Sequence, residues 1–193
     1  MHIKQFLRSG SPGTLFSAFL YFDISFMIWV MLGPLGNSIA KEFSLSATQK
    51  GLMAATPVLA GAFLRLVLGP TADRIGARKT ALIALALTFL PLLMGAYAAT
   101  SFEMVLVVGV LLGIAGASFA VALPMASRWY PPEQQGLVMG IAGAGNSGTV
   151  LAAIFAPRLA QYFGDWRPVF LTAMAPLAIT WVVIALLAKD APG

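Results

Sequence analysis

The first chemistry that the sequence offers is a single arginine, Arg65, inside the apolar stretch Gly51 to Pro70. No acidic side chain lies within a helical turn of it on either side. A guanidinium in the middle of a bilayer costs roughly 2.5 to 3.5 kcal/mol on insertion scales, so it is retained where it faces a cavity, an ion or an opposite charge. Arg65 is therefore predicted to bind an anion.

Asp23 is the one acidic residue deep in the first apolar run. A carboxyl group in a cavity that closes can take up and release a proton, so Asp23 is a candidate for proton coupling. It also lies only about two helical turns from the start of the run, where water or a base can reach it. Both interpretations stay open at this point.

A cluster of small residues marks the fifth apolar run and forms a face that lets another helix backbone approach closely. Its members are Gly140, Gly143, Gly145, Gly148, Ala152, Ala153 and Ala156. Helix packing alone would explain this face. It does not explain Asn146, whose amide is costly against lipid and is therefore expected at an interface or a cavity wall.

The composition places these residues in a membrane. Hydrophobic residues make up 59% of the 193-residue chain and charged residues 10%, with a mean hydropathy of +0.87, which does not fit a surface that faces water. The net charge of +5 does not indicate nucleic-acid binding, because the bases are scattered at the ends of apolar runs. There is no cysteine and one histidine, His2, so neither a metal site nor a cofactor is expected.

With about 20 residues for one crossing, the apolar runs predict an all-α membrane protein with six transmembrane helices. The runs are Leu15–Ala40, Gln49–Pro70, Thr80–Ala98, Glu103–Ser127, Leu137–Tyr162 and Val169–Ala188. Residues 1–14 are then a cytoplasmic amino-terminal segment, residues 15–188 the bundle, and residues 189–193 the start of a cytoplasmic linker. Glu103, at the start of the fourth run, is expected to cap its helix.

The basic residues at the ends of the runs predict the orientation. An even number of spans returns the chain to its starting side, and the side with more bases is cytoplasmic. That side carries Lys4, Arg8, Arg74, Arg78, Lys79, Arg128 and Lys189, and the opposite side carries Lys41, Lys50, Arg158 and Arg167. We therefore expect a multi-pass protein of the cytoplasmic (inner) membrane with both termini in the cytoplasm.

The loop from Gly69 to Lys79 concentrates charge between the second and third runs. Asp73, at a helix end, can pair with a base, and Arg128 at the end of the fourth run is its expected partner. Together with Arg74 and Arg78, this pair is predicted to act as a gate. The alternative is a positive loop that only sets orientation, although orientation requires neither an aspartate nor a pair of glycines.

Two of these motifs resemble those of known transporters. The charged loop is similar to the signature loop of the major facilitator superfamily, in which Gly, Asp-Arg, a second Gly and a basic cluster follow in order; Ala77 departs from it where many members have the first base. The run Gly143-Ala144-Gly145-Asn146-Ser147-Gly148 resembles the nitrate signature of the nitrate/nitrite porter family, with Ala144 where other members often have a bulkier residue.

The resemblance implies a binding site. In that family an arginine of the second helix contacts the anion, an aromatic ring packs against it and the fifth-helix signature lies beside it. The corresponding positions here are Arg65, Phe119, Asn146, Gly143 and Gly145. The flat donor fork of a guanidinium also suits a planar, weakly hydrated anion better than a lysine does. The implied function is transport of nitrate or nitrite by alternating access, either as exchange or as symport with protons.

The resemblance also implies that the chain is one half of a transporter. Superfamily members have twelve helices in two halves, and each half consists of two three-helix inverted repeats. The family's second arginine would come from the other half. The expected partners are the anion, the lipid bilayer and a second six-helix half, either in the same reading frame or on a separate chain; a homodimer is also open.

Other functions fit parts of the sequence. A different small anion suits the same arginine. A structural six-helix subunit explains the small-residue face but not Arg65. The stretch Gly145 to Gly148 also reads as the Gly-x-Ser-Gly motif of a rhomboid-type intramembrane serine protease, but that mechanism needs a base beside the serine, and His2 lies outside every run. No enzyme is therefore expected.

Overall fold

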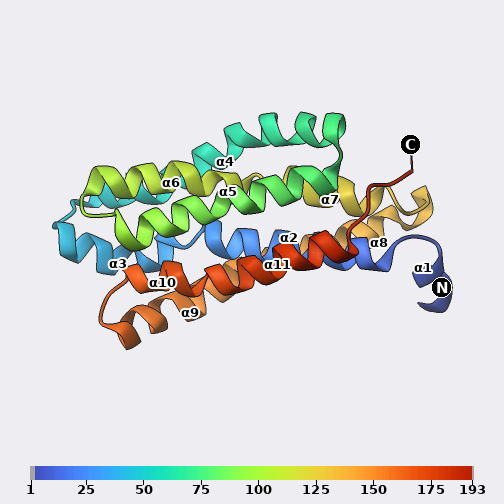
Figure 1. Cartoon of the computed structure of the whole chain (residues 1–193). Coiled ribbons are helices and arrows are strands. Elements are labelled where there is room, and N and C mark those ends of the chain that lie inside the picture. The colour runs from blue at the N-terminus through green and yellow to red at the C-terminus, as the bar shows by residue number, and fades with distance from the viewer. Residues whose placement is uncertain (1–2, 193) are drawn as a thin grey trace.

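The computed structural model describes residues 3–192, and this part of the chain is helical with no strand (Figure 1). Six helical segments are long and apolar enough to cross a membrane. They are Pro12–Phe43, Ala47–Ile75, Ala77–Tyr97, Phe102–Ser127, Pro132–Phe163 and Arg167–Leu187. The predicted fold class and all six predicted spans are confirmed, with helix ends displaced by a few residues. His2 lies outside the described residues.

Four of the spans are interrupted rather than continuous. The elements are α1 (Ile3–Arg8), α2 (Pro12–Trp29), α3 (Leu32–Phe43), α4 (Ala47–Ile75), α5 (Ala77–Tyr97), α6 (Phe102–Gly116), α7 (Phe119–Ser127), α8 (Pro132–Gly143), the 3-10 turn η1 (Ala144–Ser147), α9 (Gly148–Phe163), α10 (Arg167–Thr172) and α11 (Met174–Leu187). The interruptions between α6 and α7, and at η1, lie next to the residues that the sequence singled out for anion binding.

Side-chain caps fix where several helices begin. Ser46 and Gln49 form a capping box at the start of α4, with hydrogen bonds of 3.2 and 2.9 Å. At the start of α6 the Ser101 hydroxyl accepts from the Met104 N–H at 3.3 Å. Glu103 was expected to be the cap, but it lies in the first turn of α6. The cap is Ser101, because a serine hydroxyl at the N-cap position reaches a first-turn N–H directly.

The bundle is built around α2. This helix packs against α6, α7, α8, η1, α9 and α11, and side chains such as Tyr21 and Ile28 are fully buried. Both chain ends lie at the same end of the bundle in Figure 1. In contrast, α4 exposes large apolar side chains along its length, among them Leu59, Phe63 and Leu66. The second span therefore has a face that the described residues do not cover.

Glycines permit the close helix contacts. A Cβ added at Gly113 of α6 would lie 2.6 Å from the Ala60 Cβ and 2.7 Å from the backbone of Gly61, both in α4. The predicted small-residue face of the fifth span divides: Gly145 and Gly148 pack on α2, whereas Gly140 and Gly143 meet nothing within 4 Å. Two of the four glycines of that face thus pack against another helix, and the other two are open.

Gly113→Ala should destabilise the protein, because the added methyl group pushes α4 and α6 apart, an overpacking cost of about 1–3 kcal/mol. Gly140→Ala is the matched control: its Cβ meets open space, and alanine is the better helix former by roughly 1 kcal/mol. Thermal unfolding of the purified protein in detergent should give a lower Tm for Gly113→Ala and an unchanged or higher Tm for Gly140→Ala. Equal Tm values would contradict the packing described here.

Candidate anion site

Arg65 lies on α4 and reaches across to the break between α6 and α7. Its Nε and Nη2 atoms both donate to the carbonyl oxygen of Gly116, each at 3.3 Å. In a continuous helix that oxygen would accept from the N–H of Ala120, but Ala120 donates to Ala117 instead, at 3.1 Å. The break therefore leaves a backbone carbonyl free, and the arginine uses it.

Two aromatic rings flank the guanidinium. The Cζ atom of Arg65 lies 5.4 Å from the ring centre of Phe119 and 5.7 Å from that of Trp29. Both distances fall within the range of about 6 Å in which a cation is attracted to an aromatic face. The structure thus brings together two of the predicted site residues, Arg65 and Phe119, and adds Trp29.

Arg65 has no acidic partner among residues 3–192. The ion pairs found there involve other arginines: Arg128 with Asp73 at 2.6 Å, and Arg167 with Glu42 at 2.7 Å and with Asp165. The Gly116 carbonyl occupies only one edge of the guanidinium, since an arginine has five N–H donors. The Nη1 side of the fork is therefore available to a ligand with oxygen acceptors.

Trp29 packs tightly between the spans. A Cβ added at Gly116 would collide with its ring and one at Gly61 would lie 3.1 Å from it, and its Nε1 donates to the Pro57 carbonyl at 2.8 Å. The same ring also lies beside Arg65. No local pattern marks this role, because it depends on glycines from two other spans that leave room for an indole.

The fifth-span signature lies on the other side of the aromatic residues. Phe22 of α2 lies 5.6 Å from Phe119, measured between ring centres, and packs on Gly145 of η1. Asn146 is exposed, and no hydrogen bond joins its side chain to Arg65 in the described structure. The arginine and the signature segment are thus linked through Phe22 and Phe119 rather than by direct contact.

Asp23 is buried, with 7% of its surface exposed, and accepts a hydrogen bond of 2.7 Å from the Ser147 hydroxyl. Within residues 3–192 Asp23 forms no ion pair with a base; its carboxyl group is buried and its hydrogen-bond partner is a hydroxyl. Sequence reasoning missed Ser147 as a partner because the two residues are 124 positions apart.

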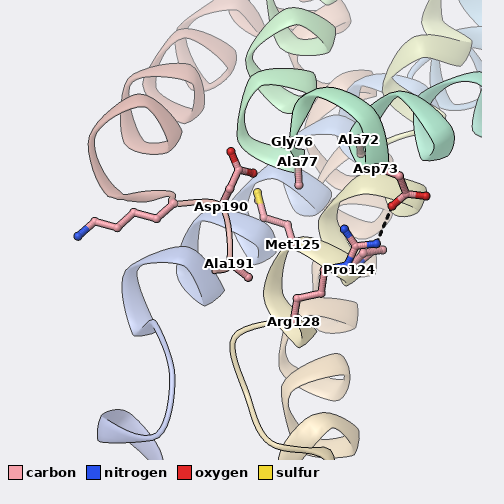
Figure 2. Close-up of a pocket in the computed structure, with 10 residues that line it drawn as sticks. Ala72, Asp73, Gly76, Ala77, Pro124, Met125, Arg128, Asp190 and Ala191 are labelled. Atoms are coloured by element: carbon pink, nitrogen blue, oxygen red, sulfur yellow. Dashed lines mark hydrogen bonds and ion pairs between the residues drawn. The ribbon is translucent and has the colours of Figure 1, made fainter. Parts of the chain in front are cut away.

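The predicted pair at the end of the bundle that carries both termini is present. Asp73 and Arg128 form an ion pair of 2.6 Å between side chains that are 62% and 51% exposed (Figure 2). Arg74 is exposed and forms no ion pair within residues 3–192. Arg78 points elsewhere: its Nη2 donates to the Ala185 carbonyl at 2.6 Å.

Asp190 was predicted to lie at the start of a linker. It also contacts this charged end of the bundle, at Arg78. Its Oδ1 atom accepts from the backbone N–H of Arg78 at 2.9 Å, and so it caps α5 from outside the helix. Gly76, with φ of +95°, makes room for this carboxylate, because a Cβ there would lie 2.6 Å from Asp190 Oδ2. Figure 2 shows Asp190 beside Gly76 and Ala77. These three residues line a pocket of about 180 Å³.

Six membrane-spanning helical segments, one of which carries an arginine with no acidic partner among residues 3–192, define a helical multi-pass membrane protein. The chain belongs to the major facilitator superfamily, whose family model matches residues 14–193. Its fold is similar to the crystal structure of a bacterial homolog of the human lysosomal transporter Spinster in an inward-facing, occupied conformation. The TM-score is 0.76 at 21% identity, over 92% of this chain and 44% of that one.

Relatives of this chain carry names that refer to nitrate, among them the following two. The probable nitrate/nitrite transporter NarK2 of Mycobacterium tuberculosis is 40% identical over 171 residues, which cover 88% of this chain and 43% of that protein. The probable nitrate/nitrite antiporter NarK1 of Thermus thermophilus is 39% identical over 140 residues, which cover 72% of this chain and 31% of that protein. The chain thus spans less than half the length of these relatives.

Asp190→Ala should loosen the first turn of α5, because removing a capping side chain costs about 0.5–2 kcal/mol. Asp190→Asn should not, since asparagine caps about as well as aspartate. Hydrogen exchange of the backbone amides of residues 77–80 measures this local opening. Faster exchange in the alanine variant alone is the expected outcome, and equal exchange in both variants and the parent would show that Asp190 does not cap α5.

Proposed function

We propose that this chain is one half of a secondary transporter that moves nitrate or nitrite across the cytoplasmic membrane by alternating access. The observation that carries the proposal is Arg65: a guanidinium within a membrane span, between two aromatic rings, hydrogen-bonded to a neutral carbonyl and not to a carboxylate. The names of the relatives support nitrate and nitrite as the anions.

The proposed binding mode follows from the free side of the arginine. A planar oxyanion can accept two parallel N–H bonds from a guanidinium, a geometry that a lysine cannot supply. Phe119, with its ring 5.4 Å from Cζ, is placed to cover the flat face of such an anion and keep water out. Asn146, Gly143 and Gly145 are proposed to line the same space once the transporter closes around its substrate.

The gate is proposed to be the charged cluster of Asp73, Arg74, Arg78 and Arg128. Its ion pair is exposed, and exposed pairs are worth only about 0–1 kcal/mol, so it can break and form during a transport cycle. We place this end of the bundle, with both termini, on the cytoplasmic side, because it carries more of the basic residues.

A second six-helix half is proposed to cover the exposed face of α4. Leu59, Phe63 and Leu66 are exposed along that helix, which is also the one that carries Arg65. The length of the relatives supports such a partner. The gene sequence beyond the codon for Gly193 tests this: a second set of spans with its own embedded arginine is expected there or in a neighbouring gene.

The alternatives differ from this proposal in what they require of the site. A different small anion would use the same guanidinium, and a structural subunit would use the same helix packing but would have no need of an uncompensated charge. Proton symport requires a group that takes up and releases a proton, whereas exchange of one anion for another does not. Asp23 is the one buried carboxyl group among the described residues and is therefore the proton-coupling candidate.

Arg65→Lys in the complete transporter should abolish saturable nitrate uptake into vesicles, because the flat donor fork is lost although the charge remains. Membrane insertion should be intact, since the two side chains cost similar amounts in a bilayer. Arg158→Lys is the matched control, because Arg158 is exposed and bonds only to Ile154 of its own helix. Normal saturable uptake by Arg65→Lys would remove Arg65 from the site.

A further inference from the structure

The contact between Asp23 and Ser147 joins the first and fifth spans. Ser147 is the last residue of η1, the 3-10 turn that separates α8 from α9 and contains Asn146. Its hydroxyl donates to Asp23 Oδ1 at 2.7 Å. Within residues 3–192 this is the one side-chain hydrogen bond between the spans Pro12–Phe43 and Pro132–Phe163. It lies at the point where the fifth span departs from α-helical geometry.

The backbone around this hydrogen bond is closely fitted. A Cβ added at Gly145 would lie 2.7 Å from the Phe22 ring and 2.9 Å from the Asp23 nitrogen, and one at Gly148 would overlap the Asp23 carbonyl oxygen. The two glycines thus hold η1 directly against one turn of α2. Sliding η1 along α2 would break the polar contact and lose the packing at both glycines.

The same turn of α2 also touches the other part of the anion site. Phe22, the neighbour of Asp23, packs against Phe119, whose ring lies beside Arg65. One turn of α2 therefore contacts η1 through Asp23, and it contacts Phe119, the neighbour of Arg65, through Phe22. A displacement of η1 relative to this turn would change the distance between Asn146 and the guanidinium.

We propose that Asp23 is a positioning residue for the anion site: through Ser147 it holds η1, and with it Asn146, at a fixed place beside Phe22 and Phe119. This role rests on the proposed function and does not require the carboxyl group to titrate. Its one hydrogen-bond partner among the described residues is Ser147, so Asp23 acts on the site through η1 and not as a ligand.

The first test is nitrate transport by the complete transporter in proteoliposomes. Ser147→Ala and Asp23→Ala should raise KM for nitrate roughly fivefold to tenfold, the effect of one lost hydrogen bond, with kcat changed less. Asp23→Asn should keep KM within about twofold of the parent, because its amide oxygen accepts the same bond. If Asp23→Asn is as defective as Asp23→Ala, the ionisable carboxyl group is what matters and the positioning role is overturned.

A second test reads the position of η1 without transport. The chain has no cysteine, so a single one can be introduced at Ala142, which is fully buried just before η1. In the Ala142→Cys protein, labelling by a maleimide should become several-fold faster when Ser147→Ala or Asp23→Ala is added, and should be unaffected by Asp23→Asn. An introduced cysteine at Ala156, buried in α9 beyond the break, is the control and should not respond.

The two tests separate failure of this inference from failure of the proposed function. If the parent protein carries no nitrate but labelling responds as expected, the contact holds η1 and the substrate assignment is wrong. If the parent carries nitrate but neither KM nor labelling responds to Ser147→Ala, the transport proposal stands and Asp23 does not position the segment.

Discussion

The structure depends on how one positive charge is accommodated inside an apolar span. A guanidinium in a bilayer needs hydrogen-bond acceptors, and the usual solution is a carboxylate. Here the acceptor is the Gly116 carbonyl, which is free because the fourth span breaks after α6. The two rings beside the charge, from Trp29 and Phe119, supply further electrostatic support.

The close fit of the helices follows from this arrangement. Trp29 reaches Arg65 only because Gly61 and Gly116 leave space for an indole between three spans. About two helical turns before Trp29, α2 meets η1 through Gly145 and Gly148. Since α2 contacts both sets of glycines, it sets the separation between the arginine and the fifth-span signature. Glycine at these positions is a requirement of helix approach, so a methyl group there costs packing even where the backbone conformation is ordinary.

Much of this could be predicted from the sequence. Hydropathy predicts the six spans, and local spacing shows that Arg65 has no acidic neighbour in the sequence. The charges at two helix ends predict the pairing of Asp73 with Arg128. The break at Ala117 and Ser118 could not be predicted, because neither residue is a helix breaker. It is stabilised by contacts that Arg65 makes from another span. Trp29, Ser147 and Asp190 acquire their roles in the same way, through partners distant in the chain.

Because Arg65 is bonded to a peptide oxygen and not to a carboxylate, the structure bears on the rates of anion binding and release. Removing one member of a buried ion pair costs about 3–5 kcal/mol. If a carboxylate were paired with Arg65, every arriving anion would have to compete with that carboxylate. A peptide oxygen carries only a partial charge and leaves the opposite edge of the guanidinium free. Under the proposed function, an anion then binds and leaves at that edge without a rearrangement of protein charges.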